Sequence, residues 1–481
     1  MNLLKNSVIY FIGNILNRVG GFLLLPLYTK MLSVEEYGVL EFSYSVSAFV
    51  AIILGAGLAH TTLRFYFDRA DDARGRVIVT SFYLISFYAV PILFLVYYFS
   101  GYINGYTLEV VNGDYYIRLL VVIIYIELLN EIFYAYLRAS DRALTFIIVS
   151  FGKLILQVSI SIVALSYMDM KIDGVLYANM IGLLSIWLYL ISLVVKNCGF
   201  RYEKAVVFPM LRYSLPIAGS SLLGVVIVNS DKIFLKEIIG YAAVGIYALA
   251  SKFALILSYS IYEPFQKAYG PYRFSIMNDE DAGEQYSRVS YLSIVLACIV
   301  MVPINLFSQE VIYSLATVDY HEAHQFILPL TLSVVFQIMA YNFQTPILIQ
   351  KKTGSILNIT MISAVFNIFA MYFLIKTFGI MGGGLGMLVT NALIAVLTLK
   401  LAVNYMVVHY KHIRSMIVIF VAVVFSLPVF FMQPGLIASQ LAIKLFLVVL
   451  FLSGLFFFDS DIRAYSQKLL FNKLINKCQK V

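Results

Sequence analysis

The sequence has few charged residues and few cysteines for its length. Only 12% of its 481 residues are Asp, Glu, Lys or Arg, whereas a soluble domain has about 25%. Hydrophobic residues make up 61%, which is more apolar surface than a water-soluble fold can hide. The three cysteines, Cys198, Cys298 and Cys478, show no pairing pattern and predict no disulfide framework. These shortages exclude a soluble or disulfide-stapled protein and favour a protein that lies within a membrane.

Long apolar runs cover almost the whole chain. A helix that crosses a bilayer needs ~20 apolar residues, and cutting the sequence at its polar breaks gives about fourteen runs of that length. Barrel strands need only ~9–11 alternating residues, so we predict an all-α integral membrane protein. We expect the first run to be an uncleaved helix, because it contains Arg18 and lacks a small-residue cleavage site at the right distance. The predicted spans are 7–31, 38–63, 77–100, 117–137, 144–166, 172–195, 211–239, 243–268, 287–307, 324–349, 354–378, 381–405, 414–432 and 439–458.

Lys and Arg are distributed unevenly between alternate loops. If the N-terminus is cytoplasmic, most of the 34 basic residues fall in the cytoplasmic loops and the C-terminal tail. Such a bias predicts a multi-pass protein of the bacterial cytoplasmic membrane, with both termini inside and an even number of helices. The net charge of +8 then reflects topology, and we expect no nucleic-acid partner. The opposite side receives only Lys30, Arg118, Lys171, Lys236 and Lys376.

The segments outside the predicted spans are short. The longest outer loop is predicted at 101–116, which is too small to carry the catalytic residues of a polysaccharide polymerase or ligase. We therefore expect no enzyme and no cofactor other than a coupling ion, H⁺ or Na⁺. The tail from Asp459 places lysines among leucines and isoleucines, a pattern typical of a basic amphipathic helix on the anionic inner leaflet. It is either an anchor to anionic lipids or a partner site.

Residues 1–45 and 208–252 look alike at one constant offset. Lys5 falls on Arg212, Ser7 on Ser214 and Gly38 on Gly245. Six predicted spans separate the copies, so the halves are parallel, a transporter plan that places the substrate site at the repeat interface. We predict an N-lobe at 1–204, a C-lobe at 205–405, and two peripheral helices with the basic tail at 406–481.

Three stretches resemble one known family. They are Asn6-Ser7-Val8-Ile9-Tyr10-Phe11 through Ser33-Val34-Glu35-Glu36-Tyr37-Gly38, then Arg212-Tyr213-Ser214-Leu215-Pro216 through Ala243-Val244-Gly245-Ile246-Tyr247, and Leu137-Arg138-Ala139-Ser140-Asp141-Arg142. The chain resembles the Wzx-like polysaccharide and O-antigen flippases of the multidrug/oligosaccharidyl-lipid/polysaccharide exporter superfamily. The resemblance implies fourteen helices in two six-helix lobes with two peripheral helices, and a V-shaped central cavity. It also implies export of an undecaprenyl-pyrophosphate-linked oligosaccharide, with polysaccharide polymerase or assembly proteins as candidate partners.

Several basic residues lie deep inside apolar runs. A charge at bilayer depth costs at least ~2.5–3.5 kcal/mol on insertion scales, so it persists where it is paired or lines a wet cavity. The guanidinium of Arg can grip phosphate through two hydrogen bonds, and we expect Lys252 to face Arg18 across the repeat interface. Pairing with acidic neighbours or simple lobe packing would explain the same residues. The candidate residues for a cationic substrate site are Arg18, Lys153, Lys232, Lys252 and Arg64.

Polar side chains follow single faces of several predicted helices. Glu127 and Glu131 stand one turn apart, so they either bind a coupling proton or Na⁺, or neutralise nearby cations such as Lys153. Asp231 and Lys232 need not pair with each other, because adjacent helical residues point about 100° apart. The candidates for polar cavity lining and ion coupling are Asn14, Glu127, Glu131, Asp231, Tyr259, Glu263, Gln337 and Tyr341.

Three weaker features receive structural interpretations. We expect no metal at His321 and His324, which fall in an outer loop, and we expect Lys444 to snorkel from its helix end. The glycines at 382–384 and 386 favour close helix packing. Two rival functions remain beside the flippase. One is a flippase for a peptidoglycan precursor, and the other is a drug/cation antiporter of the same superfamily, which should have an acidic cavity.

Overall fold

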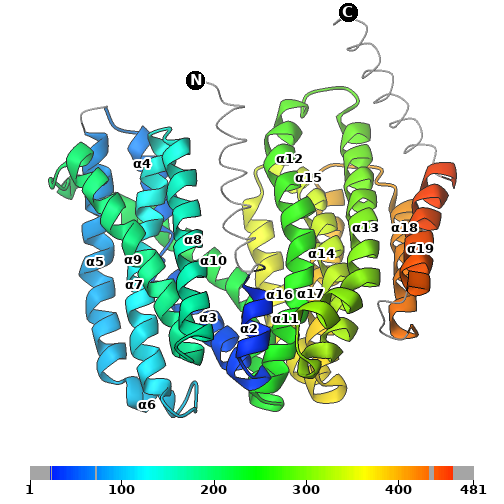
Figure 1. Cartoon of the computed structure of the whole chain (residues 1–481). Coiled ribbons are helices and arrows are strands. Elements are labelled where there is room, and N and C mark those ends of the chain that lie inside the picture. The colour runs from blue at the N-terminus through cyan, green and yellow to red at the C-terminus, as the bar shows by residue number, and fades with distance from the viewer. Residues whose placement is uncertain (1–21, 23, 71–72, 433–437, 459–481) are drawn as a thin grey trace, which may run out of the picture. The chain divides into compact units, whose positions relative to one another are not determined.

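The computed structural model describes residue 22 and residues 24–70, 73–432 and 438–458, and these residues form an all-α protein (Figure 1). Within them, thirteen helical segments are long and apolar enough to cross a membrane, from Val34–Phe67 to Ser439–Phe457. The candidates Asn14 and Arg18 and the basic tail lie outside the described residues. The all-helical membrane fold expected from the sequence is therefore confirmed.

The observed helices follow the predicted spans closely. The run predicted at 144–166 is helix α8 (Ala143–Ser166), and the run predicted at 354–378 is α16 (Thr353–Phe378). The largest differences include α13 (Ala282–Leu315), which the sequence predicts at 287–307, and α10 (Lys204–Ile238), which it predicts to begin at 211. Both helices continue beyond the apolar run. Periodicity located the apolar middle of each helix, and its polar ends extend further.

The chain divides into two compact units, Met1–Ala248 and Leu249–Val481. The N-terminal unit thus contains α10, which the sequence assigned to the second lobe, because α10 packs against α3 and α4. The other described helices of this unit are α2 (Leu25–Met31), α3 (Val34–Gly55), α4 (Leu58–Phe67), α5 (Arg74–Tyr98), α6 (Ser100–Asn104), α7 (Gly113–Ala139), α8, α9 (Lys171–Cys198) and the first half of α11 (Tyr241–Leu257).

Helix α7 forms the centre of the N-terminal unit. It packs against α5 on one side and α9 on the other, and α9 in turn carries α8 (Figure 1). The Asn130 amide of α7 donates to the Leu183 carbonyl of α9 at 3.2 Å. Helix α3 begins with a capping box, in which the Ser33 hydroxyl accepts from the Glu36 amide at 3.1 Å and Glu36 accepts from the Ser33 amide at 2.8 Å.

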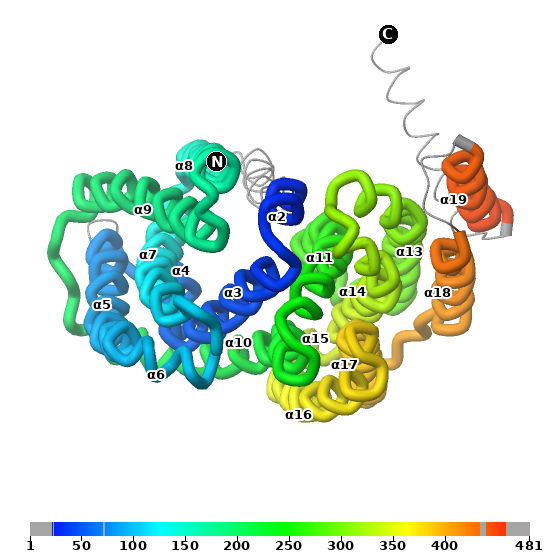
Figure 2. The backbone as a smooth tube through the Cα atoms, turned by 60° about the horizontal axis from the view of Figure 1, so that its bottom comes forward, coloured from blue at the N-terminus to red at the C-terminus, as the bar shows by residue number. Residues whose placement is uncertain are grey.

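The C-terminal unit is built around the packing of α14 and α16 on α17 (Figure 2). A Cβ atom at Gly384 would lie 2.9 Å from Pro329 of α14, and one at Gly386 would lie 2.6 Å from Met371 of α16. The glycines therefore allow the close helix packing that the sequence indicated. Its elements are η1 (Ser258–Tyr262), α12 (Glu263–Ser275), α13 (Ala282–Leu315), η2 (Val318–Phe326), α14 (Ile327–Phe343), α15 (Thr345–Ile349), α16, α17 (Ile380–Val403), α18 (His412–Ser426), η3 (Leu427–Phe430) and α19 (Ala438–Phe458).

Lys444 does not snorkel, which corrects the sequence-based expectation. Its side chain is fully buried on α19, and its ammonium pairs with Glu310 of α13 at 2.5 Å. Snorkelling would require an open route along the helix to water, whereas α13 covers this face of α19 and supplies a carboxylate instead. The pair fastens α19, which the sequence indicated to be peripheral, to α13.

Candidate functional site

Helix α3 is interrupted inside the N-terminal unit, and a cavity lies at the interruption. Ala56 and Gly57 have left-handed backbone angles, φ 44° and 68°, which end α3 and restart the chain as α4. A cavity of about 300 Å³ opens beside this break. Its lining residues come from α3, α4, α5, α7 and α10, and they include His60, Ile85, Glu127, Leu128, Glu131, Ile132 and Ser221.

The two predicted coupling carboxylates both line this cavity. Most of the apolar middle of α7 is buried, yet Glu127 and Glu131 are exposed. Exposure on such a helix means that these carboxylates face open space within the protein, as the sequence-based spacing predicted for one helix face. The structure thus brings Glu127 and Glu131 together with His60, which the sequence analysis had not considered.

Lys153 of α8 lies near the face of α7 that carries Glu127 and Glu131. Its Cγ packs near Gly182 of α9, and its ammonium interacts electrostatically with Glu127 and Glu131. Within the described part of the chain it forms no hydrogen bond or close ion pair. The half-buried ammonium therefore keeps its hydrogen-bonding capacity while two carboxylates balance its charge from a distance.

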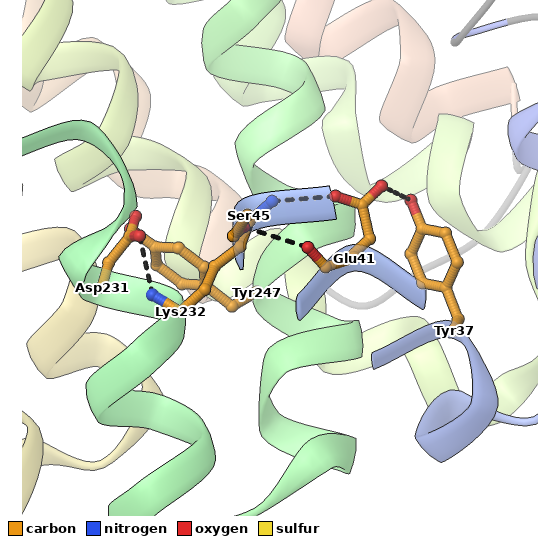
Figure 3. A network of polar contacts seen from close by, with 6 residues as sticks. All are labelled: Tyr37, Glu41, Ser45, Asp231, Lys232 and Tyr247. Atoms are coloured by element: carbon orange, nitrogen blue, oxygen red, sulfur yellow. Dashed lines mark hydrogen bonds and ion pairs between the residues drawn. The ribbon is translucent and has the colours of Figure 1, made fainter. Parts of the chain in front are cut away.

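Lys232 is held in a buried polar network between α3 and α10 (Figure 3). Its ammonium pairs with Glu41 at 2.8 Å, and the same carboxylate accepts from the Tyr37 hydroxyl at 3.1 Å. Asp231 accepts from the Tyr247 hydroxyl and from the Lys232 amide, both at 2.7 Å. The side chains of Asp231 and Lys232 do find different partners, as expected. Glu41 was missed because no other charged residue lies three or four positions from it on α3.

The remaining basic candidates lie in different surroundings. Arg64 is exposed on α4 and pairs with Asp68 at 2.7 Å, an arrangement typical of a solvated helix end. Lys252 is half-buried on α11 in the C-terminal unit. Binding of the substrate by Arg64, Lys232 or Lys252 stays a prediction.

The polar candidates of the C-terminal unit gather around a second interruption. Tyr259 lies within η1, a single π-helical turn, and Glu263 begins α12 directly after it. At the offset that places Gly38 on Gly245, η1 falls on residues 51–55, which end at the α3–α4 break. The two copies are thus interrupted at matching points, and such irregular turns are frequent at functional sites.

Tyr341 belongs to an aromatic cluster. Gln337 lies one turn before it on α14 and is half-buried. The Tyr341 hydroxyl donates to the Gln266 carbonyl at 3.3 Å, and its ring packs edge-on against Tyr262 at 6.1 Å. The Gln266 amide donates to the Tyr262 hydroxyl at 2.6 Å. Polar and aromatic side chains of η1, α12 and α14 therefore meet in this unit.

Sequence comparisons match this chain to one protein family and to two curated proteins. Residues 3–277 match the model of a family described as polysaccharide biosynthesis protein. Among curated proteins of Haemophilus influenzae, Lsg locus putative protein 1 is 21% identical over 322 residues, or 63% of this chain and 74% of that protein. An uncharacterized membrane protein of the same organism is 23% identical over 291 residues, or 57% of this chain and 66% of that protein.

Solved structures of two kinds of transporter share the fold. The lipid II flippase MurJ in an inward closed conformation superposes with a TM-score of 0.72 at 14% identity, covering 95% of this chain and 99% of that chain. An inward-facing multidrug resistance MATE family transporter of the MOP superfamily superposes with a TM-score of 0.67 at 16% identity, covering 80% and 93%. At these identities the likeness shows the fold.

Proposed function

Because this chain belongs to the polysaccharide biosynthesis protein family, we propose that it is a flippase that moves an undecaprenyl-pyrophosphate-linked oligosaccharide across the bacterial cytoplasmic membrane. The oligosaccharide would be a repeat unit of an O-antigen or a capsule. The observation that carries this proposal is the family match over 3–277, joined by the transporter fold over nearly the whole chain. No covalent chemistry is required of the protein, so it acts as a transporter and not as an enzyme.

Basic side chains within the spans supply the electrostatics of the proposed transport. Moving a pyrophosphate through a region of low dielectric costs little only where cations replace its hydration. Lys153 supports this role through its unused hydrogen-bonding capacity, and Arg18 and Lys252 are the further candidates. The lipid tail would stay in the bilayer while the headgroup crosses by alternating access.

The pair Glu127 and Glu131 is our candidate for ion coupling. Its cavity offers the two carboxylates, the Ser221 hydroxyl and the His60 imidazole in an otherwise mostly apolar lining. A hard cation needs a shell of several oxygen ligands, whereas a proton needs only one carboxylate. We therefore favour H⁺ over Na⁺ as the coupling ion.

The two rivals make different predictions. A flippase for a peptidoglycan precursor differs only in cargo, and the fold shared with a lipid II flippase suits it equally. A drug/cation antiporter should show acidic residues without the intramembrane cations found here. Experiments must therefore separate our proposal from both rivals. The peptidoglycan-precursor flippase differs from our proposal only in its cargo.

Complementation tests the proposal. The chain is expressed in one strain that lacks its O-antigen flippase and in another that lacks its peptidoglycan-precursor flippase. We expect surface polysaccharide to return in the first strain while the second stays unable to grow. Rescue of the second strain alone would identify the rival cargo.

Two substitutions test the cationic site in the rescued strain. Arg18→Ala and Lys252→Ala should each reduce polysaccharide export at unchanged protein level. Export equal to that of the unsubstituted chain in both variants would refute this assignment of residues.

A further inference from the structure

A buried arginine that forms no ion pair with any described residue stands at one end of α12. Arg273 is in the last turn of this helix and only 8% exposed. Its Nε and Nη1 atoms are enclosed and have no hydrogen-bond partner among the described residues, whereas Nη2 is not enclosed. Other arginines differ, since Arg69 pairs with Glu203 at 2.8 Å and Arg118 with Asp114 at 3.3 Å.

Aromatic rings hold the guanidinium in place. Its Cζ lies 5.1 Å from the ring centre of Tyr341, 5.1 Å from that of Phe274 and 6.0 Å from that of Tyr269. The Tyr269 hydroxyl shares a hydrogen bond of 3.0 Å with Thr345, which fixes that ring. Ring faces attract a cation but leave its N–H groups unused, so this cage positions the charge without neutralising it.

The arginine is also fixed through its backbone. The Tyr286 hydroxyl of α13 donates to the Arg273 carbonyl at 2.7 Å. The last turn of α12 is therefore tied to α13, while the side chain is held by α14 through Tyr341. A site whose charged group is fixed before binding loses little conformational entropy when a ligand arrives.

We propose that Arg273 is an anion-binding residue that takes a phosphate or pyrophosphate group at the end of α12. Leaving a buried charge without a partner is costly, and a phosphate that accepts a charge-assisted hydrogen bond from the open Nη2 would restore its balance. The surplus of Lys and Arg predicts that this end of the helix lies on the cytoplasmic side. An anion therefore reaches Arg273 from the side on which lipid-linked precursors are made.

Two anions of this chemistry are available at the membrane surface. One is the pyrophosphate of the cargo, and this reading rests on the proposed function. The other is the phosphate of an anionic phospholipid such as phosphatidylglycerol. In the first case Arg273 captures the headgroup before it enters the central path, and in the second it holds a structural lipid.

Binding to the purified full-length chain separates these sources. Farnesyl pyrophosphate, a short polyprenyl pyrophosphate, is titrated into the protein in detergent, and phosphatidylglycerol is titrated in a parallel series. We expect Arg273→Gln to weaken binding of the recognised anion about tenfold to a hundredfold, the usual worth of hydrogen bonds to a charged group. Arg273→Lys should lose less, because it keeps the charge.

Arg288→Gln is the matched control, since Arg288 is an exposed arginine near the start of the neighbouring helix α13. Its affinity should equal that of the unsubstituted chain, and thermal unfolding verifies that each variant is folded. Equal weakening by Arg273→Gln and Arg288→Gln, or no weakening by a folded Arg273→Gln, would overturn the site while leaving the proposed cargo intact. Binding of phosphatidylglycerol through Arg273 without any binding of farnesyl pyrophosphate would keep the site and count against the cargo.

Discussion

Gly38 and Gly245 occupy equivalent places in the two copies of the repeat and pack against each other. A Cβ at Gly38 would lie 1.9 Å from the Tyr241 carbonyl oxygen, and a Cβ at Gly245 would lie 2.2 Å from that of Val34. The alignment that pairs the glycines also pairs Val34 with Tyr241. The contact is therefore reciprocal, as expected where two related elements meet about a pseudo-two-fold axis.

Substituting either glycine should destabilise the protein. Because backbone atoms occupy the space of the added methyl group, Gly38→Ala or Gly245→Ala forces α3 and α11 apart at a cost of about 1–3 kcal/mol, typical of overpacking. Thermal unfolding in detergent measures the change. The control is Gly224→Ala on α10, where a Cβ meets nothing within 4 Å and where alanine should stabilise the helix slightly. Equal unfolding temperatures for all three variants would contradict the close packing of α3 against α11 at Gly38 and Gly245.

The buried pair of Glu41 and Lys232 should matter far more than a surface pair on the same helix. Lys232→Met removes a counter-charge from the buried Glu41 and should cost about 3–5 kcal/mol. Lys171→Met breaks a pair of equal length, 2.8 Å, between Lys171 and Glu36, but this pair is exposed and its loss should change little. Chemical denaturation of the two variants compares them. A larger effect from Lys171→Met would contradict the stabilising role of the buried pair shown in Figure 3.

The buried pair of Lys444 and Glu310 should respond differently to a single and to a double substitution. Lys444→Met alone should destabilise the docking of α19, because it leaves the Glu310 carboxylate buried without its partner. The double variant Lys444→Met with Glu310→Leu should recover most of that loss, because an apolar pair of similar volume needs no desolvation of charge. Hydrogen exchange of residues 438–458 reports the docking. No recovery in the double variant would indicate a role for the charges beyond packing.

The cavity carboxylates should control the dependence of transport on a proton gradient. Glu127→Gln combined with Glu131→Gln removes both carboxylates that can take up a proton beside the α3–α4 break and leaves His60 in place. Export should then lose its stimulation by an acidic outer medium, measured in membrane vesicles with an imposed pH gradient.

Glu109→Gln serves as the control for that experiment. This carboxylate lies in the loop between α6 and α7, pairs with Lys236 of α10 and does not line the cavity. It should leave the stimulation unchanged. A double cavity variant that responds to the gradient like the unsubstituted chain would exclude Glu127 and Glu131 from coupling.

The sequence predicted the helices well because each one is a long apolar run with polar ends, a signal that tertiary contacts hardly alter. Partners of buried charges were harder to predict. Glu41 pairs with Lys232 and Glu310 with Lys444 across more than a hundred residues of sequence, and helical spacing carries no information on such contacts. The same limit explains Lys444, whose place near a helix end suggested a route to water that α13 closes.

Arg273 is a residue whose burial could not be predicted from the sequence. In the sequence it is one more basic residue at a helix end predicted to be cytoplasmic, and the predicted topology alone would explain it. Only the fold reveals that it is enclosed by Tyr269, Phe274 and Tyr341. By contrast, the facing of Glu127 and Glu131 followed from their spacing, because helix geometry alone places residues four apart on one face.

Translocation in a purified system tests the central claim most directly. The full-length chain is reconstituted into vesicles that carry an undecaprenyl-pyrophosphate-linked oligosaccharide on one leaflet, and a membrane-impermeant glycosidase reports how much reaches the other leaflet. We predict translocation that depends on the protein and is reduced by Arg18→Ala and Lys252→Ala. In vesicles without the glycosidase, the protein should leave the lipid-linked sugars intact. Equal appearance on the far leaflet with and without the protein, in vesicles where it is folded and correctly inserted, would contradict the predicted translocation.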